Sequence, residues 1–201
     1  MTEQRVWLFI DRQNFYRDAR RALGCDGQSS AFGQVDFSKL GELLLSRSPQ
    51  DRPRRIDRIN VYVGIPSPDR DPYGNAAYMR QRQAWEAAGV AVHARPLAYR
   101  KDGQPEEKGV DVALAVDVVF NAARRHYDVA IIATTDTDIL PALEAALDMR
   151  RAWGTPSVEV CSWRSAKKRL HVQGSSVWCH WLEDADYPGL EDPARYGKDP
   201  T

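Results

Sequence analysis

The chain has 201 residues, a length that fits one domain with a sizeable core. Its 28 basic and 28 acidic side chains cancel, so no global positive field indicates nucleic acid or an acidic membrane surface, and such a partner has to be held by a local patch. Cys25, Cys161 and Cys179 are too few and too scattered for a disulfide framework or a cysteine-based zinc site. We therefore expect a reducing, cytoplasmic compartment. We expect no signal peptide or transmembrane segment, because Met1–Arg5 is polar and no apolar run approaches the ~20 residues that span a bilayer.

Short apolar segments alternate along the chain with stretches of helical spacing, which predicts βαβ crossovers and a largely parallel sheet. The expected strands are Arg5–Asp11, Asp57–Gly64, Val90–Arg95, Asp128–Thr134, Ser157–Trp163 and Val177–Leu182. The expected helices are Asn14–Leu23, Asp36–Arg47, Tyr73–Ala88, Gly109–Arg125 and Ile139–Arg151, with a shorter one near Ser165–His171. We predict an α/β fold, a three-layer sandwich with a mostly parallel central sheet.

Two further segments have a distinct composition. Tyr99–Lys108 is polar, and its Asp102-Gly103 pair predicts a hairpin turn. After Leu182 the chain becomes acidic and contains proline and glycine. We therefore expect one domain over residues 1–182, followed by an irregular or disordered tail over 183–201.

Two of the predicted strands deliver carboxylates at their carboxyl ends. The first runs from Val6 to Ile10 directly into Asp11, with Asn14 one turn later, and the fourth empties into Asp136 and Asp138. Because open α/β sheets bind ligands beyond the carboxyl ends of their strands, we expect these acids to meet at one rim. The pattern predicts a metal site.

A third acid comes from the Gly109–Arg125 helix. Asp111 lies in its first turn, on the apolar stripe that includes Leu114 and Val118. An unpaired carboxylate there is costly, so Asp111 either interacts with the helix dipole or joins the acids at the rim. Asp117 lies about a third of a turn off the stripe, and we expect it to face solvent or to act indirectly on the site.

Clustered carboxylates suit Mg²⁺ or Mn²⁺, which prefer oxygen ligands and support in-line displacement at phosphorus. The pattern therefore favours a phosphodiester hydrolase. Structural alternatives exist for single acids: Asp11 could end its strand in an Asx turn, and Asp138 could cap the helix that begins at Ile139. Asp136 has the weakest structural alternative, because ending a buried strand requires no charge.

Basic residues that could hold a nucleic acid fall in two regions. The window Arg150–Arg169 interleaves cations with Trp153 and Trp163, a pattern typical of a single-strand groove, although packing inside the protein is the favoured interpretation of both tryptophans. The segment Asp69–Arg82 follows the second strand and could clamp a nucleic-acid backbone. The candidate contacts from these two regions are Arg70, Arg80, Arg164, Lys167 and Lys168.

Three motifs resemble the NYN domain family, which is related to PIN-domain nucleases and includes LabA-like bacterial proteins. Phe9–Asn14 resembles the family's F-(V/I)-D-x-x-N opening, and Lys108–Leu114 matches its K-G-V-D-x-x-L motif, with Asp117 on a further common acid. Thr134–Pro141 resembles S-G-D-S-D-F-x-P. The motifs occur in the family's order between residues 9 and 141.

This resemblance implies a PIN-like sheet and a Mg²⁺- or Mn²⁺-dependent ribonuclease acting on single-stranded or structured RNA. The catalytic and metal-binding residues that it implies are Asp11, Asp111, Asp136 and Asp138. Asn14 would orient Asp11 or a water. No membrane partner is expected, and the sequence leaves a homo-oligomer open.

The chain departs from the family pattern beside the acids. Arg12 stands where glycine is frequent, and Thr134-Thr135 replaces the usual Ser-Gly, which makes these three residues candidate substrate contacts as well. Two alternatives stay open: an RNA-binding or regulatory module that keeps the acids but cleaves nothing, and a small-molecule phosphohydrolase with a closed pocket.

Overall fold

A six-stranded sheet in the order β3-β2-β1-β6-β7-β8 forms the centre of the computed structural model, which describes residues 2–194 and 196–197. All neighbouring strands in it run parallel. The strands are β1 (Gln4–Asp11), β2 (Arg54–Ile65), β3 (Ala91–Pro96), β6 (Val129–Ala133), β7 (Ser157–Trp163) and β8 (Trp178–Leu182). A separate antiparallel hairpin pairs β4 (Ala98–Tyr99) with β5 (Pro105–Glu106).

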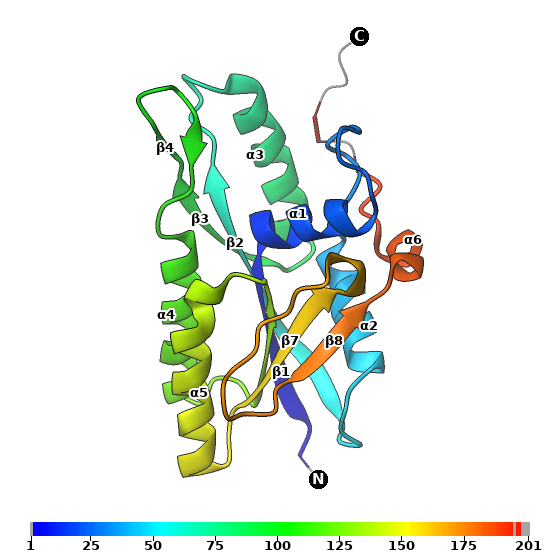
Figure 1. Ribbon diagram of the computed structural model, residues 1–201, viewed down its shortest axis with the longest axis vertical. Helices are drawn as coiled ribbons and strands as arrows, with labels where there is room; N and C mark the ends of the chain where they lie inside the picture. The colour runs from blue at the N-terminus through cyan, green and yellow to red at the C-terminus, as the bar shows by residue number, and fades with distance from the viewer. Residues whose placement is uncertain (1, 195, 198–201) are drawn as a thin grey trace.

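Helices cover both faces of the sheet (Figure 1). They are α1 (Arg12–Ala22), α2 (Phe37–Ser46), α3 (Pro72–Ala87), α4 (Val110–Ala123), α5 (Leu140–Trp153) and α6 (Tyr187–Leu190). Short 3-10 turns occur at η1 (Thr137–Ile139), η2 (Arg164–Ala166) and η3 (Asp184–Asp186). The result is the three-layer α/β sandwich that the alternation of strands and helices predicts.

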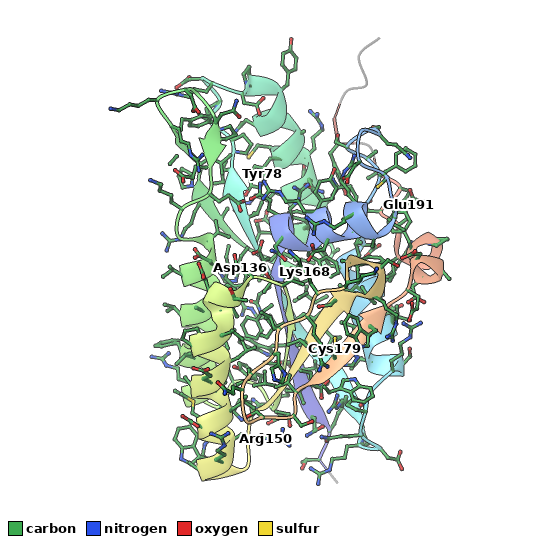
Figure 2. All side chains as sticks on the ribbon, viewed as in Figure 1. Tyr78, Asp136, Arg150, Lys168, Cys179 and Glu191 are labelled. Carbon is green, nitrogen blue, oxygen red and sulfur yellow. The ribbon has the colours of Figure 1, made fainter. Side chains whose placement is uncertain are left out.

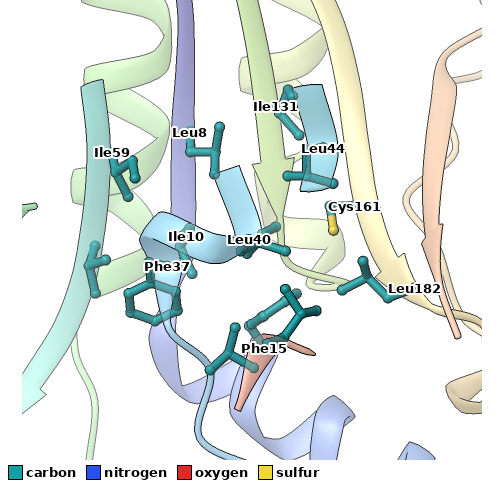
Figure 3. Close-up of a cluster of buried hydrophobic side chains, with 14 of the residues drawn as sticks. Leu8, Ile10, Phe15, Phe37, Leu40, Leu44, Ile59, Ile131, Cys161 and Leu182 are labelled. Atoms are coloured by element: carbon teal, nitrogen blue, oxygen red, sulfur yellow. The ribbon is translucent and has the colours of Figure 1, made fainter. Parts of the chain in front are cut away.

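Side chains of β1 alternate between the two cores. Leu8 and Ile10 pack with residues of α1 and α2 on one face, as Figure 3 shows, whereas Trp7 and Phe9 pack with α4 and α5 on the other. This alternation follows from the period of two in an extended strand. Both faces are apolar because both are covered, which explains the continuous apolar run in the sequence.

The chain winds outward from the middle of the sheet in two directions. It passes from β1 to β2 and β3, then crosses back to β6 and continues to β7 and β8. β1 and β6 are neighbours, but the connection after β1 leads toward β2 on one side and the connection after β6 leads toward β7 on the other. Open α/β sheets bind ligands in the crevice that forms at such a switch point.

The predicted helix near Ser165–His171 is wrong. Only η2 forms there, and it is terminated by Lys167, the next residue, whose φ of 57° is left-handed. The chain then continues without regular structure, and Leu170 and Val172 are buried against the sheet. Their apolar spacing reflects that burial and not a helical period.

The prediction of an irregular segment from residue 183 is also wrong for its first part. Glu183 and Asp186 form a capping box around η3, and Tyr187 and Leu190 of α6 are buried in the core that contains α2. Acidic residues here serve local caps, so an acidic composition does not by itself indicate an irregular segment. Residues 195 and 198–201 of the predicted tail lie outside the described residues.

Across the described chain, no helix has both the length and the apolar character to cross a membrane. Cys25, Cys161 and Cys179 are all buried free thiols.

Candidate active site

Asp11 ends β1 and begins α1 at the switch point of the sheet. Its Oδ1 accepts a hydrogen bond from the backbone N–H of Asn14 at 3.0 Å, so it caps the helix as well as facing the rim. The side chain is almost fully buried. Burial, with added repulsion from Glu107 and Asp136, raises the pKa of Asp11 to about 6 despite that hydrogen bond. A cap alone does not require this unfavourable environment.

Asp136 follows β6, the strand beside β1, and faces the same rim. Its Oδ1 accepts the N–H of Asp138 at 3.0 Å, so Asp136 is the cap of η1. The hypothesis that Asp138 caps the next helix is therefore wrong, because η1 separates β6 from α5 and the α5 cap, Ile139, forms no side-chain hydrogen bond. Asp138 is exposed and does not line the pocket that contains Asp11.

Asn14 and the two threonines fix the loop that carries Asp136. The amide oxygen of Asn14 accepts the Thr135 N–H at 2.8 Å, and the Thr135 hydroxyl donates to the buried Asp18 at 2.6 Å. The fully buried Thr134 hydroxyl accepts the Asp136 N–H at 3.1 Å and donates to Asp11 at 3.4 Å. Both threonine hydroxyls thus have protein partners, and they hold the loop in place without the glycine of the family motif.

A pocket of about 330 Å³ brings the acids together, and we call it the acidic pocket. Asp11, Asp136 and Asp111 all line it, from β1, the β6 loop and the first turn of α4. Figure 2 labels Asp136 beside the upper end of α5, where the strands of the central sheet end. Three of the four predicted acids therefore converge.

Glu107 is a further acid of this pocket that the sequence interpretation missed. Its Oε1 accepts the N–H of Gly64, at the end of β2, at 2.8 Å. Burial raises its pKa, and Asp111 adds to the rise, although the hydrogen bond from Gly64 and nearby arginines oppose it. The sequence signal for it is its place just before the Lys108–Leu114 motif, but its polar neighbours indicate only a hairpin.

The donor set of the acidic pocket fits a hard divalent cation. Four lining side chains offer carboxylate oxygens: Asp11, Glu107, Asp111 and Asp136. The pKa values of Asp11 and Glu107 are raised, and a bound cation would lower them again by favouring the ionised carboxylates. No three acidic, histidine or cysteine side chains of residues 2–194 and 196–197 form a ready-made coordination cluster. The residues therefore suit an ion such as Mg²⁺, which uses one or two carboxylates and keeps several waters.

Asp117 does not reach the acidic pocket. It lies further along α4, accepts a hydrogen bond from the Tyr62 hydroxyl at 2.8 Å and is 3.4 Å from His93. Burial, followed by the charge of Asp117, raises the pKa of Tyr62. The acid therefore anchors α4 to β2 and β3, which explains its presence without any role at the rim.

Arginines border the acidic pocket, but they are not the ones that the sequence suggested. Arg17 and Arg100 line it, and Arg100 is paired with Glu106 at 3.1 Å. Arg12 lines a neighbouring cavity. Arg70 stacks on Tyr99 with its guanidinium carbon 4.9 Å from the ring centroid, beside the hairpin. Another candidate, Arg80 on α3, donates to the backbone carbonyl of Tyr196.

The window Arg150–Arg169 does not form one groove. Arg150 lies near the end of α5, by the amino ends of the strands, whereas Lys168 follows the carboxyl end of β7. Figure 2 shows the two well apart. Trp163 is fully buried, as the favoured interpretation expects, whereas Trp153 is 47% exposed and contacts Arg125. The whole of β7 separates the two ends of the window.

The distal half of the window lies at the carboxyl end of β7, next to β6. Arg164 donates to Glu183 at 2.5 Å, whereas Lys167 and Lys168 are exposed just beyond η2. These lysines therefore lie beyond the carboxyl ends of the strands, as the acidic pocket does.

Comparisons with known proteins agree with this architecture. The crystal structure of a protein of unknown function from Vibrio parahaemolyticus RIMD 2210633 superposes with a TM-score of 0.59, at 18% identity, over 90% of this chain and 93% of that one. At this identity the likeness supports the fold alone. No curated protein shows a significant match. The model of the family described as NYN domain matches residues 5–172, and the chain therefore belongs to the NYN domain family.

Proposed function

We propose that the chain is a divalent-cation-dependent ribonuclease that hydrolyses RNA phosphodiesters at the acidic pocket. NYN domains are a nuclease-like family related to PIN domains, and membership supports the class of reaction. The observation that carries the proposal is the convergence of Asp11, Asp111 and Asp136 from three separate elements on one pocket at the switch point.

Each acid has a proposed role. Asp11 and Asp136 would be the principal holders of Mg²⁺ or Mn²⁺, because they flank the switch point. Asp111 and Glu107 would complete the negative wall of the pocket. Asp138, on the exposed side of η1, would help to position the attacking water. When bound, such a cation lowers the pKa of a coordinated water and polarises a phosphoryl oxygen.

The RNA substrate would be held by the arginine and lysine side chains around the pocket. Arg17 and Arg100 border the acids directly, and their guanidinium groups suit two-point contacts to a phosphate. Lys167 and Lys168 extend the positive surface beyond the carboxyl ends of the strands and would contact the backbone of a longer RNA. We also propose the reducing, cytoplasmic setting that the free cysteines suggest.

Substitution of Asp136 by asparagine tests the proposal. The wild-type protein should cleave a panel of single-stranded and structured RNAs only when Mg²⁺ or Mn²⁺ is added, and D136N should lower the rate by roughly 100-fold or more. D148N, a change in an exposed acid on α5, is the matched control and should leave the rate unchanged. Electrophoresis of labelled RNA measures the products.

Two outcomes would contradict the proposal. Equal background products from the wild type and D136N would mean that the acidic pocket cleaves nothing. RNA retention without cation-dependent products would favour the non-catalytic RNA-binding module.

A further inference from the structure

A second cavity, of about 600 Å³, lies beside the acidic pocket, between the start of α1, the end of β2 and α3. We call it the α1–α3 cavity. Gly64 connects the two: it lines this cavity, and its N–H donates to Glu107 of the acidic pocket. Arg12 also lines the cavity and directly follows Asp11 in the chain. A ligand that occupies one site therefore borders the other.

Arg12 places an incompletely bonded cation in this cavity. The described lining residues include no carboxylate, and the Nε atom of Arg12 is buried without a hydrogen-bond partner among them. Its guanidinium carbon lies 4.7 Å from the centroid of the Tyr16 ring. One terminal nitrogen reaches the amide oxygens of Gln34 and Gln81 only at 3.4 Å. The charge of Glu107, in the adjoining acidic pocket, also acts on Arg12. A partly buried guanidinium with such weak hydrogen bonds favours an anionic ligand, and phosphate suits its planar donors.

The opposite wall offers a second unused polar group. Tyr78 of α3 is only 6% exposed, and its buried hydroxyl forms no well-aligned hydrogen bond within the described chain, although the Arg82 guanidinium one turn along the helix is a charged neighbour. Figure 2 shows it where α3 approaches β2. Beside it, the buried Gln81 amide is already paired with Gln34 at 3.0 Å, which fixes its position. An aromatic ring with a free hydroxyl next to fixed amides suits a planar ligand with polar edges, as a nucleobase is.

We propose that the α1–α3 cavity binds the nucleotide that adjoins the scissile phosphodiester of an RNA chain. Its phosphate would lie on Arg12, and its base would lie against Tyr78. The inference rests on the proposed function for the identity of the substrate. The cavity volume is within the range of ordinary small-ligand sites. A site of this kind would give the nuclease a base preference, which the acidic pocket alone cannot provide because phosphates carry no sequence information.

The test measures binding separately from cleavage, in the full chain carrying D136N. A fluorescently labelled hexaribonucleotide is titrated with protein, and the four nucleoside 5′-monophosphates and their nucleosides then compete for it. The variants are R12Q and Y78F, and Y73F is the matched control, because Tyr73 is on the same helix but 83% exposed. Thermal unfolding checks that each variant is folded.

We expect monophosphates to displace the hexaribonucleotide, with one base preferred. Y78F should weaken the preferred monophosphate by about 3- to 10-fold and flatten the base preference, the effect of losing one hydrogen bond. R12Q should weaken monophosphates by about tenfold or more but leave nucleosides unchanged. Y73F should change nothing.

The inference is overturned if monophosphates do not displace the hexaribonucleotide, or if both variants bind as the control does. Saturable monophosphate binding that leaves the hexaribonucleotide in place would instead identify a free-nucleotide site and also overturn it. The proposed hydrolysis is judged separately, by the cation-dependent products of the wild type. Expected binding without such products would reject the ribonuclease and keep the nucleotide site.

Discussion

At the scale of single residues, Asp11 opposes stability in the cation-free protein. Its pKa is raised to about 6, chiefly by burial, so the folded state disfavours the ionised form relative to the unfolded chain. The penalty is fully present above pH 6 and disappears as the pH falls below the ordinary aspartate pKa of 3.8, so Asp11 makes the chain less stable at neutral pH. Such a cost is typical of functional sites.

Replacement by asparagine separates stability from activity. D11N keeps an oxygen for the Asn14 N–H but removes the charge, so at pH 7 in a chelator it should raise the free energy of unfolding by on the order of 2 kcal/mol. The same variant should lose cation-dependent RNA cleavage. Urea unfolding at pH 7 and pH 4 measures the difference, which should shrink at the lower pH. A variant less stable than the wild type at pH 7 would show that capping, and not repulsion, dominates at this position.

The acids differ in how well the sequence could locate them. Asp11 and Asp136 were predictable because a buried strand that ends in a charge has few structural explanations. Glu107 was not, because its position depends on the hairpin folding back until its carboxylate meets Gly64. Asp117 matched a family acid, but its partner Tyr62 comes from a distant strand. No local spacing encodes such contacts.

At the scale of elements, the β4–β5 hairpin borders the acidic pocket because Gly64, the next-to-last residue of β2, has no side chain. A Cβ atom on Gly64 would lie 2.7 Å from the Glu107 Oε1 and would overlap the side chain of Leu97. The hairpin would have to move away from β2. Glu107 would then lose its position beside Asp111.

We therefore expect G64A to reduce RNA cleavage at least tenfold, while destabilising the fold by only about 1–3 kcal/mol. G189A is the matched control, because a Cβ there meets nothing within 4 Å. Initial rates at saturating Mg²⁺, together with denaturant unfolding, measure both effects. Wild-type rates in G64A would mean that the hairpin position is irrelevant to the site.

Elements with strong periodicity could be predicted from the sequence, and those decided by tertiary contacts could not. All six strands and the five long helices occur where apolar spacing placed them, with ends displaced by a few residues. The failures are segments whose apolar residues pack without a regular period, such as Leu170 and Val172. The short α6 forms because Tyr187 and Leu190 find a core to fill.

At the scale of the whole molecule, a buried ion pair spans the sheet from one half to the other. Arg54 at the start of β2 contacts Glu159 on β7 at 2.9 Å, across β1 and β6, and both side chains are 3% exposed. His180 of β8 contacts the same carboxylate at 2.7 Å. The two halves that meet at the switch point are thus linked, and sequence spacing could not reveal a contact that depends on strand order.

Glu159 gives the last prediction. Burial by itself would raise its pKa, but the hydrogen bonds from His180 and Arg54 outweigh burial and hold the pKa below 4.5. Its stabilising effect is therefore complete above the unfolded pKa and lost as the pH falls through the lower, folded value. E159Q leaves the Arg54 charge buried and unpaired, so it should reduce the free energy of unfolding by about 3 kcal/mol at pH 7.

The pH dependence distinguishes this ion pair from simple packing. The difference between E159Q and the wild type should narrow as the pH falls through the lowered folded pKa of Glu159, where the wild-type carboxylate also takes up a proton. D148N removes an exposed partner of Arg151, so it should reduce the free energy of unfolding by less than about 1 kcal/mol both at pH 7 and at acidic pH. Urea unfolding followed by tryptophan fluorescence measures all three proteins. If E159Q cost no more than D148N, the ion pair would add no net stability to the β1–β6 pairing and the apolar core, because it would then offset only its own desolvation.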